Sequence, residues 1–152
     1  MTNSSKQKNK QSLSLSGEYG VCSELHKRGV LASITYGNSK SADIIIVKAD
    51  KAFVVEVKTS MKQRIVTSFF QKYTTRDTTP RPDFWVIAHI NEQTLLTDFY
   101  VLTHEEMASE QMKRNNMSEW EVSDGMKKGV CNILLPQLSE YKNRWDTIIN
   151  AI

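Results

Sequence analysis

The chain has 152 residues, of which 39% are hydrophobic, and a formal net charge of +3 at pH 7. This length suits a single domain with its own core. No apolar run approaches the length of a membrane span, and the polar N-terminus lacks the apolar segment of a signal peptide. We therefore expect a cytoplasmic protein with no membrane partner. Its two cysteines, Cys22 and Cys131, match no zinc or Cys-x-x-Cys spacing and are expected to be reduced.

Basic residues are concentrated in the first part of the chain. Residues 1–91 carry 14 Lys/Arg against 7 Asp/Glu, whereas residues 92–152 carry 6 against 10. This asymmetry suits the approach of an anionic polymer to one side of the domain. Lys6, Lys8 and Lys10 supply three of these charges from the polar N-terminus, so charge by itself gives only weak support for a nucleic-acid partner.

The N-terminal residues 1–15 have low hydrophobicity and no periodicity, which predicts a disordered polar, basic tail. Ser16 is a good N-cap, and residues 17–28 are predicted to form a helix that ends at Gly29. We expect residues 16–152 to form one domain, because no internal repeat or second domain is evident.

A β-hairpin is predicted next. Residues 30–36 favour a strand, and residues 37–41 have the composition of a loop. The run at 44–47, Ile-Ile-Ile-Val, predicts that a strand over 43–48 is buried on both faces. A turn at 49–51 and a strand over 52–58 complete an antiparallel pair.

The remaining segments alternate between helix and strand. We predict a helix around 63–73, a loop at 74–82, and strands over 83–90 and 98–102 that are joined by a turn at 91–92. Thr103 and Glu106 form a capping-box pattern for a helix over 105–115. Residues 117–129 show no regular pattern, and 130–135 favour an extended segment. Pro136 is expected to open a last helix that runs to about residue 150.

Glu18 is an acidic residue on the core-facing stripe of the first helix, which also carries Val21, Cys22 and Leu25. The ordinary explanation is favourable interaction of a carboxylate with the helix dipole in the first turn. Asp43 precedes an apolar strand, and aspartate is uncommon within strands. The ordinary explanation is that an aspartate at the end of a loop caps a turn.

Glu56 and Lys58 lie on one side of their strand, opposite Val55 and Val57. Taken alone, such a pair is typical of a solvated strand face. Asp43 shares that side only if paired positions in the hairpin sum to an odd number, which requires a two- or four-residue connection around 49–51, or a bulge. Two carboxylates and the Val57 carbonyl would then offer the oxygen ligands that Mg²⁺ prefers. A bound cation would also relieve their mutual repulsion.

The pattern of Glu18, Asp43 and Glu56-Val57-Lys58 resembles the PD-(D/E)xK nuclease superfamily, and in particular its archaeal Holliday junction resolvase branch. The resemblance covers about residues 16–60 well and the strands between 82 and 102 loosely, and Ala42 stands where the motif's name has proline. It implies an α/β, restriction-endonuclease-like fold with a mixed central β-sheet flanked by helices.

The resemblance also implies a function, the Mg²⁺-dependent hydrolysis of DNA phosphodiester bonds by an endonuclease, with Mn²⁺ able to substitute. Asp43, Glu56 and the Val57 carbonyl would bind the metal, Glu18 would complete its shell, and Lys58 would orient and activate the attacking water. Lys62 and Arg64 either contact phosphates or form the wet face of a helix. A homodimer that cuts two strands, an RNA-directed nuclease, and a non-catalytic nucleic-acid-binding or assembly module remain open.

Overall fold

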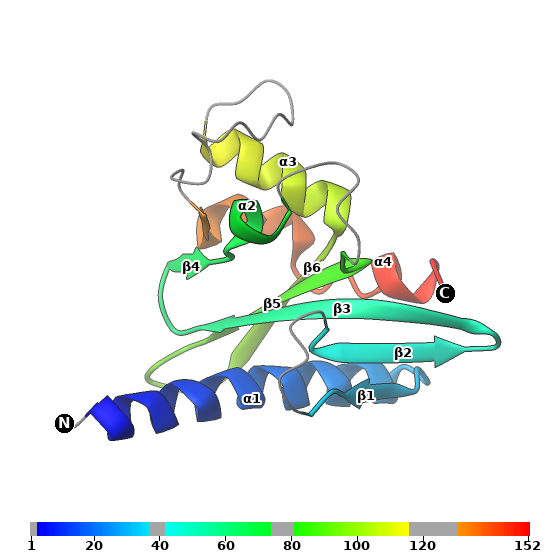
Figure 1. Ribbon diagram of the computed structural model, residues 1–152, viewed down its shortest axis with the longest axis horizontal. Helices are drawn as coiled ribbons and strands as arrows, with labels where there is room; N and C mark the ends of the chain where they lie inside the picture. Colours follow the sequence, from blue (N-terminus) through cyan, green and yellow to red (C-terminus); the bar gives the residue numbers. More distant parts are fainter. Residues whose placement is uncertain (1–2, 37–41, 74–80, 116–130) are drawn as a thin grey trace.

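The computed structural model describes residues 3–36, 42–73, 81–115 and 131–152. Its centre is a five-stranded mixed sheet with helices on both faces, which confirms the predicted α/β architecture (Figure 1). In spatial order, the strands of this sheet are β1 (Ala32–Ile34), β2 (Ile44–Lys48), β3 (Lys51–Ser60), β5 (Phe84–Ile90) and β6 (Thr97–Thr103). Strands β3 and β5 are parallel, and the other neighbours are antiparallel.

A second sheet of two strands pairs β4 (Arg64–Val66) with β7 (Asn132–Leu134). The helices are α1 (Asn3–Lys27), α2 (Phe69–Lys72), α3 (His104–Arg114) and α4 (Asp146–Ile149), with a 3₁₀ helix η2 (Leu135–Tyr141). In Figure 1, α1 runs beneath β2 and β3, while β4, α2 and α3 lie on the opposite side of the sheet. None of the helices in the described part of the chain combines the length and apolarity needed to span a bilayer.

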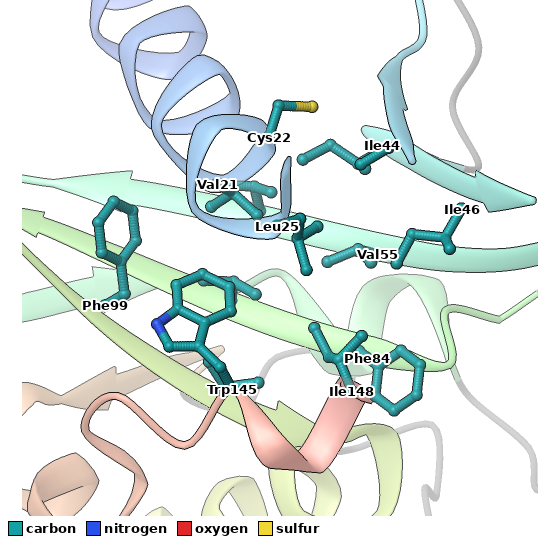
Figure 2. Close-up of a cluster of buried hydrophobic side chains, with 14 of the residues drawn as sticks. Val21, Cys22, Leu25, Ile44, Ile46, Val55, Phe84, Phe99, Trp145 and Ile148 are labelled. Carbon is teal, nitrogen blue, oxygen red and sulfur yellow. The ribbon is translucent and has the colours of Figure 1, made fainter. Parts of the chain in front are cut away.

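The face of the central sheet that α1 and α4 cover holds one hydrophobic core. Val21 and Leu25 of α1 point toward the strands, and Trp145 and Ile148 approach the same face from the C-terminal segment (Figure 2). Val21, Leu25 and Ile148 are fully buried. The apolar stripe of α1 therefore fixes the residues beside it, Glu18 among them, against the sheet.

The opposite face holds a second, more aromatic core. Phe69 and Phe70 of α2 pack here with Trp85 of β5, and Tyr73 and His104 contact the same rings. The indole Nε1 of Trp85 donates a hydrogen bond to Nδ1 of His104 at 3.1 Å. This cluster anchors the short helix α2, whose last residue is Lys72, on the same side of the sheet as Glu56.

The first helix begins at Asn3, so the predictions of a disordered segment up to residue 15 and of an N-cap at Ser16 are wrong for the described residues. The hydroxyl of Ser16 donates to the Leu13 carbonyl at 2.6 Å, as in a helix interior. Lysine, glutamine and leucine are good helix formers, and no proline interrupts residues 3–16. Packing of residues 21–25 against the sheet offsets the unfavourable free energy of helix nucleation, so the helix can propagate toward the N-terminus.

Three further predictions are wrong in part. Residues 64–66 form β4 instead of a helix, because they pair with β7, and only 69–72 are helical. Strand β2 is buried on one face only, and Val47 is 60% exposed. The expected C-terminal helix is interrupted between η2 and α4 at Asn143, whose φ is 55°.

Other predictions are confirmed. Strands form at 32–34, 51–60, 84–90, 97–103 and 132–134, within or around the expected ranges. The capping box at Thr103 and Glu106 forms with both reciprocal hydrogen bonds, and Cys22 and Cys131 are free thiols. The predicted loop at 37–41, residues 74–80 of the predicted loop at 74–82, and the irregular segment at 117–129 lie outside the described residues.

Candidate functional site

Asp43 lies where the β2–β3 hairpin opens. Lys48 pairs with Lys51 and Ile44 with Val55, so the connection has two residues and the paired positions sum to an odd number. This is one of the registers required for Asp43 to share a face with Glu56. The Oδ2 atom of Asp43 accepts a hydrogen bond from the backbone N–H of Val57 at 2.8 Å. The hairpin therefore positions Asp43 directly beside Glu56-Val57-Lys58.

Glu56 lies on the face of β3 opposite Val55 and Val57, but it is not solvated. It is 3% exposed, so the interpretation of this pair as an ordinary wet strand face is wrong for Glu56. Its Oε1 atom lies 2.7 Å from Nζ of Lys58 and 3.2 Å from Nζ of Lys72. Two lysines on different elements thus compensate one buried carboxylate, as burial of a charge requires.

Glu18 reaches the same site from α1. It lies one helical turn before Val21 and Cys22, both buried in the first core, and its own side chain is half-buried. The pKa of Glu18 is raised to about 7, mainly by burial and then by the nearby Asp43 and Glu56 carboxylates, while Lys58 acts in the opposite direction. The first helix therefore brings a third carboxyl group into electrostatic contact with the hairpin.

Asp43 also has a raised pKa. Burial is the main cause and the Glu56 carboxylate the second, and the Val57 N–H, Lys58 and Lys72 act in the opposite direction. A site with several carboxyl groups whose pKa values are raised by burial and by each other favours a bound cation, because a cation stabilises all the charged forms together.

A groove of about 480 Å³ runs along this site. Glu18, Asp43, Val57 and Lys58 line it, and the two predicted phosphate contacts, Lys62 and Arg64, lie on its wall, together with Lys10 of α1. Of the predicted site residues, only Glu56 does not line the groove, although its ion-pair partner Lys58 does. The fold therefore gathers into one groove residues of α1, the hairpin and β4 that are distant in the sequence.

The donor set suits a hard divalent cation without forming a complete cage. In the described ranges, no three His, Cys, Asp or Glu side chains are grouped closely enough to hold a metal. Mg²⁺ is commonly held by only one or two carboxylates and several waters. Asp43 and Val57 line the groove, so the Asp43 carboxylate and the Val57 carbonyl fit such a site, whereas the Glu56 carboxylate is paired with Lys58 and Lys72.

Two residues of this site were missed by the sequence analysis. Lys72 lies three residues after Phe69. Its position next to two apolar aromatic residues was the local sequence feature that could have indicated its place near the core. Lys10 was assigned to a disordered tail, but it lines the groove because α1 begins at Asn3. It lies two helical turns before Glu18, so helical periodicity would have placed both residues on one face.

No family model, curated protein or solved structure significantly matches this chain. A proposal for the function of this protein therefore rests on the geometry and the chemical groups of the site.

Proposed function

We propose that this protein is a metal-dependent endonuclease that hydrolyses DNA phosphodiester bonds. The observation that carries the proposal is the hydrogen bond from the Val57 N–H to Asp43 at 2.8 Å. It joins the lone aspartate to the Glu56-Val57-Lys58 strand at the groove that Glu18 also lines. An acid–acid–lysine arrangement beside cationic groove walls suits an anionic substrate whose cleavage needs a positioned water.

Each residue has a distinct role in this proposal. Asp43, Glu56 and the Val57 carbonyl would hold Mg²⁺, with Glu18 completing the shell directly or through water. When bound, the metal acts as a Lewis acid and lowers the pKa of water. Lys58 orients the attacking water and offsets charge on the phosphate. The oxygen of the attacking water bonds to phosphorus and its proton passes to solvent, while the bond from phosphorus to the leaving oxygen breaks and that oxygen keeps the electron pair and takes up a proton from solvent water.

The test is cleavage by the purified protein of duplex, branched and single-stranded DNA and of RNA, with Mg²⁺, Mn²⁺ or EDTA. We expect metal-dependent cutting that Lys58→Ala abolishes while nucleic-acid binding survives. Lys51→Ala is the matched control, because Lys51 is an exposed lysine at the other end of the same strand. Equal cutting by Lys58→Ala and wild type would remove Lys58 from the reaction. RNA cutting without DNA cutting would instead identify an RNA-directed nuclease.

One observation favours a second candidate, a non-catalytic nucleic-acid-binding module on the same fold. The Glu56 carboxylate is compensated by two lysines, and this pairing needs no metal. In that case the site is a structural ion-pair network beneath a cationic groove. Binding of nucleic acid without cutting of any substrate, with either metal, would favour this candidate.

A further inference from the structure

A second hollow adjoins the groove at the candidate site. This hollow measures about 280 Å³, and Ser14, Glu18 and Asp43 line both cavities. The second hollow is also lined by Thr35 and Tyr36, which follow β1. The two cavities therefore meet at the acidic residues and differ in their remaining lining.

The lining of the second hollow includes an aromatic side chain that is open to solvent. Tyr36 is 76% exposed and Tyr19 of α1 is 52% exposed, and their hydroxyl oxygens lie 3.1 Å apart. Single exposed apolar side chains are common and need no explanation. Two exposed tyrosines from different elements that meet at their hydroxyl groups, one of which lines the hollow, are a different case. They present aromatic faces on which a planar base can stack.

The lining of the groove includes cationic side chains. Lys10 comes from α1, Lys58 from β3, and Lys62 and Arg64 from the connection into β4 and from β4 itself. The hydroxyl-bearing residues Ser14, Thr59, Ser60 and Ser68 also line this cavity. Lysine, arginine and hydroxyl groups are the usual donors to phosphate oxygens. Cations from several elements that line one groove suit a single phosphate backbone that runs along it.

We propose that the groove and the adjoining hollow act as one channel that binds an unpaired nucleic-acid strand, with its phosphates between Lys10 and the Lys62–Arg64 segment and a base stacked on Tyr36. The choice of polymer rests on the proposed function. The volumes of both hollows lie near the range that encloses one small-molecule-sized group, roughly 300–1,000 Å³. Under this proposal the two hollows take one or two nucleotides of a single strand, and a double helix remains outside. The strand that crosses the channel then passes Glu18 and Asp43.

Binding without cleavage tests this proposal. A labelled single strand of about 12 nucleotides, as DNA and as RNA, and the matching duplex are titrated with the full chain in EDTA. We expect the single strand to bind more tightly than the duplex. Tyr36→Leu should weaken single-strand binding roughly tenfold, because stacking of one base is lost. Tyr36→Phe keeps the ring and should bind like wild type, as should Leu31→Ala, which changes an equally exposed residue of a different cavity.

A second measurement addresses the cationic wall. Lys10→Ala should reduce the slope of log affinity against log salt by about 0.7 for the single strand, because one phosphate contact is lost. If either the DNA or the RNA single strand binds more tightly than the duplex, the proposal is supported, and the tighter of the two strands shows whether the site prefers deoxyribose or ribose. The proposal is overturned if the duplex binds as tightly as the single strand, if neither binds, or if Tyr36→Leu binds like wild type. Single-strand binding without metal-dependent cutting would defeat the proposed function alone, and cutting confined to duplexes would defeat this inference alone.

Discussion

The ammonium group of Lys72 lies 3.2 Å from Oε1 of Glu56, the oxygen that Lys58 also contacts. Glu56 is almost fully buried, whereas the side chain of Lys72 is 38% exposed. The aromatic packing of α2 holds this second lysine at the candidate metal site. Lys72 therefore competes with any cation that uses Glu56 as a ligand.

Replacement of Lys72 should separate its stabilising ion pair with Glu56 from its competition with a bound metal ion. We expect Lys72→Met to lower the free energy of unfolding in EDTA by about 1 kcal/mol, since Lys58 remains and Lys72 is partly solvated. The same variant should bind Mn²⁺ more tightly than wild type, because one of the two lysines that compete for Glu56 is removed. Denaturant unfolding and metal titration measure the two effects. Lys62→Met is the control on the same groove, and equal effects of the two substitutions would argue against competition at Glu56.

Divalent metal should stabilise the folded protein. Mg²⁺ or Mn²⁺ is expected to raise the melting temperature, because a ligand that binds only the native state shifts the unfolding equilibrium. Asp43→Asn should remove most of this shift. The amide oxygen of the new side chain can still accept the hydrogen bond from Val57, so the hairpin is preserved while the charge is lost. A full metal-induced shift in Asp43→Asn would exclude Asp43 as a ligand.

The protonation of Glu18 should make stability depend on pH. Its pKa is about 7 in the folded protein against an ordinary value of 4.5, so the folded state binds this proton more tightly than the unfolded chain. The resulting stabilisation is fully present below pH 4.5 and is lost as the pH rises through 7. In EDTA, the free energy of unfolding should therefore fall over this interval. Glu18→Gln should flatten the fall and leave the smaller contribution of Asp43, whose pKa is also raised. Identical slopes in wild type and variant would show that Glu18 is not perturbed.

Gly17 should tolerate no side chain, although it lies inside a helix. A Cβ at this position would lie 1.8 Å from Oγ1 of Thr59 on β3. On an exposed helix, alanine would be favoured by about 1 kcal/mol. Here we expect Gly17→Ala to cost about 1–3 kcal/mol of stability through overpacking. The double variant Gly17→Ala with Thr59→Ala should recover part of this loss, because it removes Oγ1 and Cγ2 of Thr59 but keeps its Cβ, 2.9 Å from the added methyl group. Denaturant unfolding measures the recovery. A lack of recovery would mean that α1 does not approach β3 so closely.

The sequence determined the features that depend on neighbouring residues. Alternation in Val55-Glu56-Val57-Lys58 predicted which side chains share a face of β3, and the capping box at Thr103 predicted the start of α3. These patterns are local, since a strand repeats every two residues and a helix every 3.6. The parity argument for Asp43 was equally local, because it depends only on the length of the connection in a hairpin.

Only the tertiary structure decided the contacts between distant segments. Residues 64–66 have helical periodicity with their neighbours, but pairing with β7, far later in the chain, satisfies their backbone as a strand. Lys72 becomes part of the site because α2 packs on the far side of the sheet from α1. Lys10 lines the groove because tertiary packing of residues 21–25 supports a helix that extends back to Asn3. Burial and long-range pairing outweigh local preference in each case, because their free energies exceed the differences in propensity among these residues.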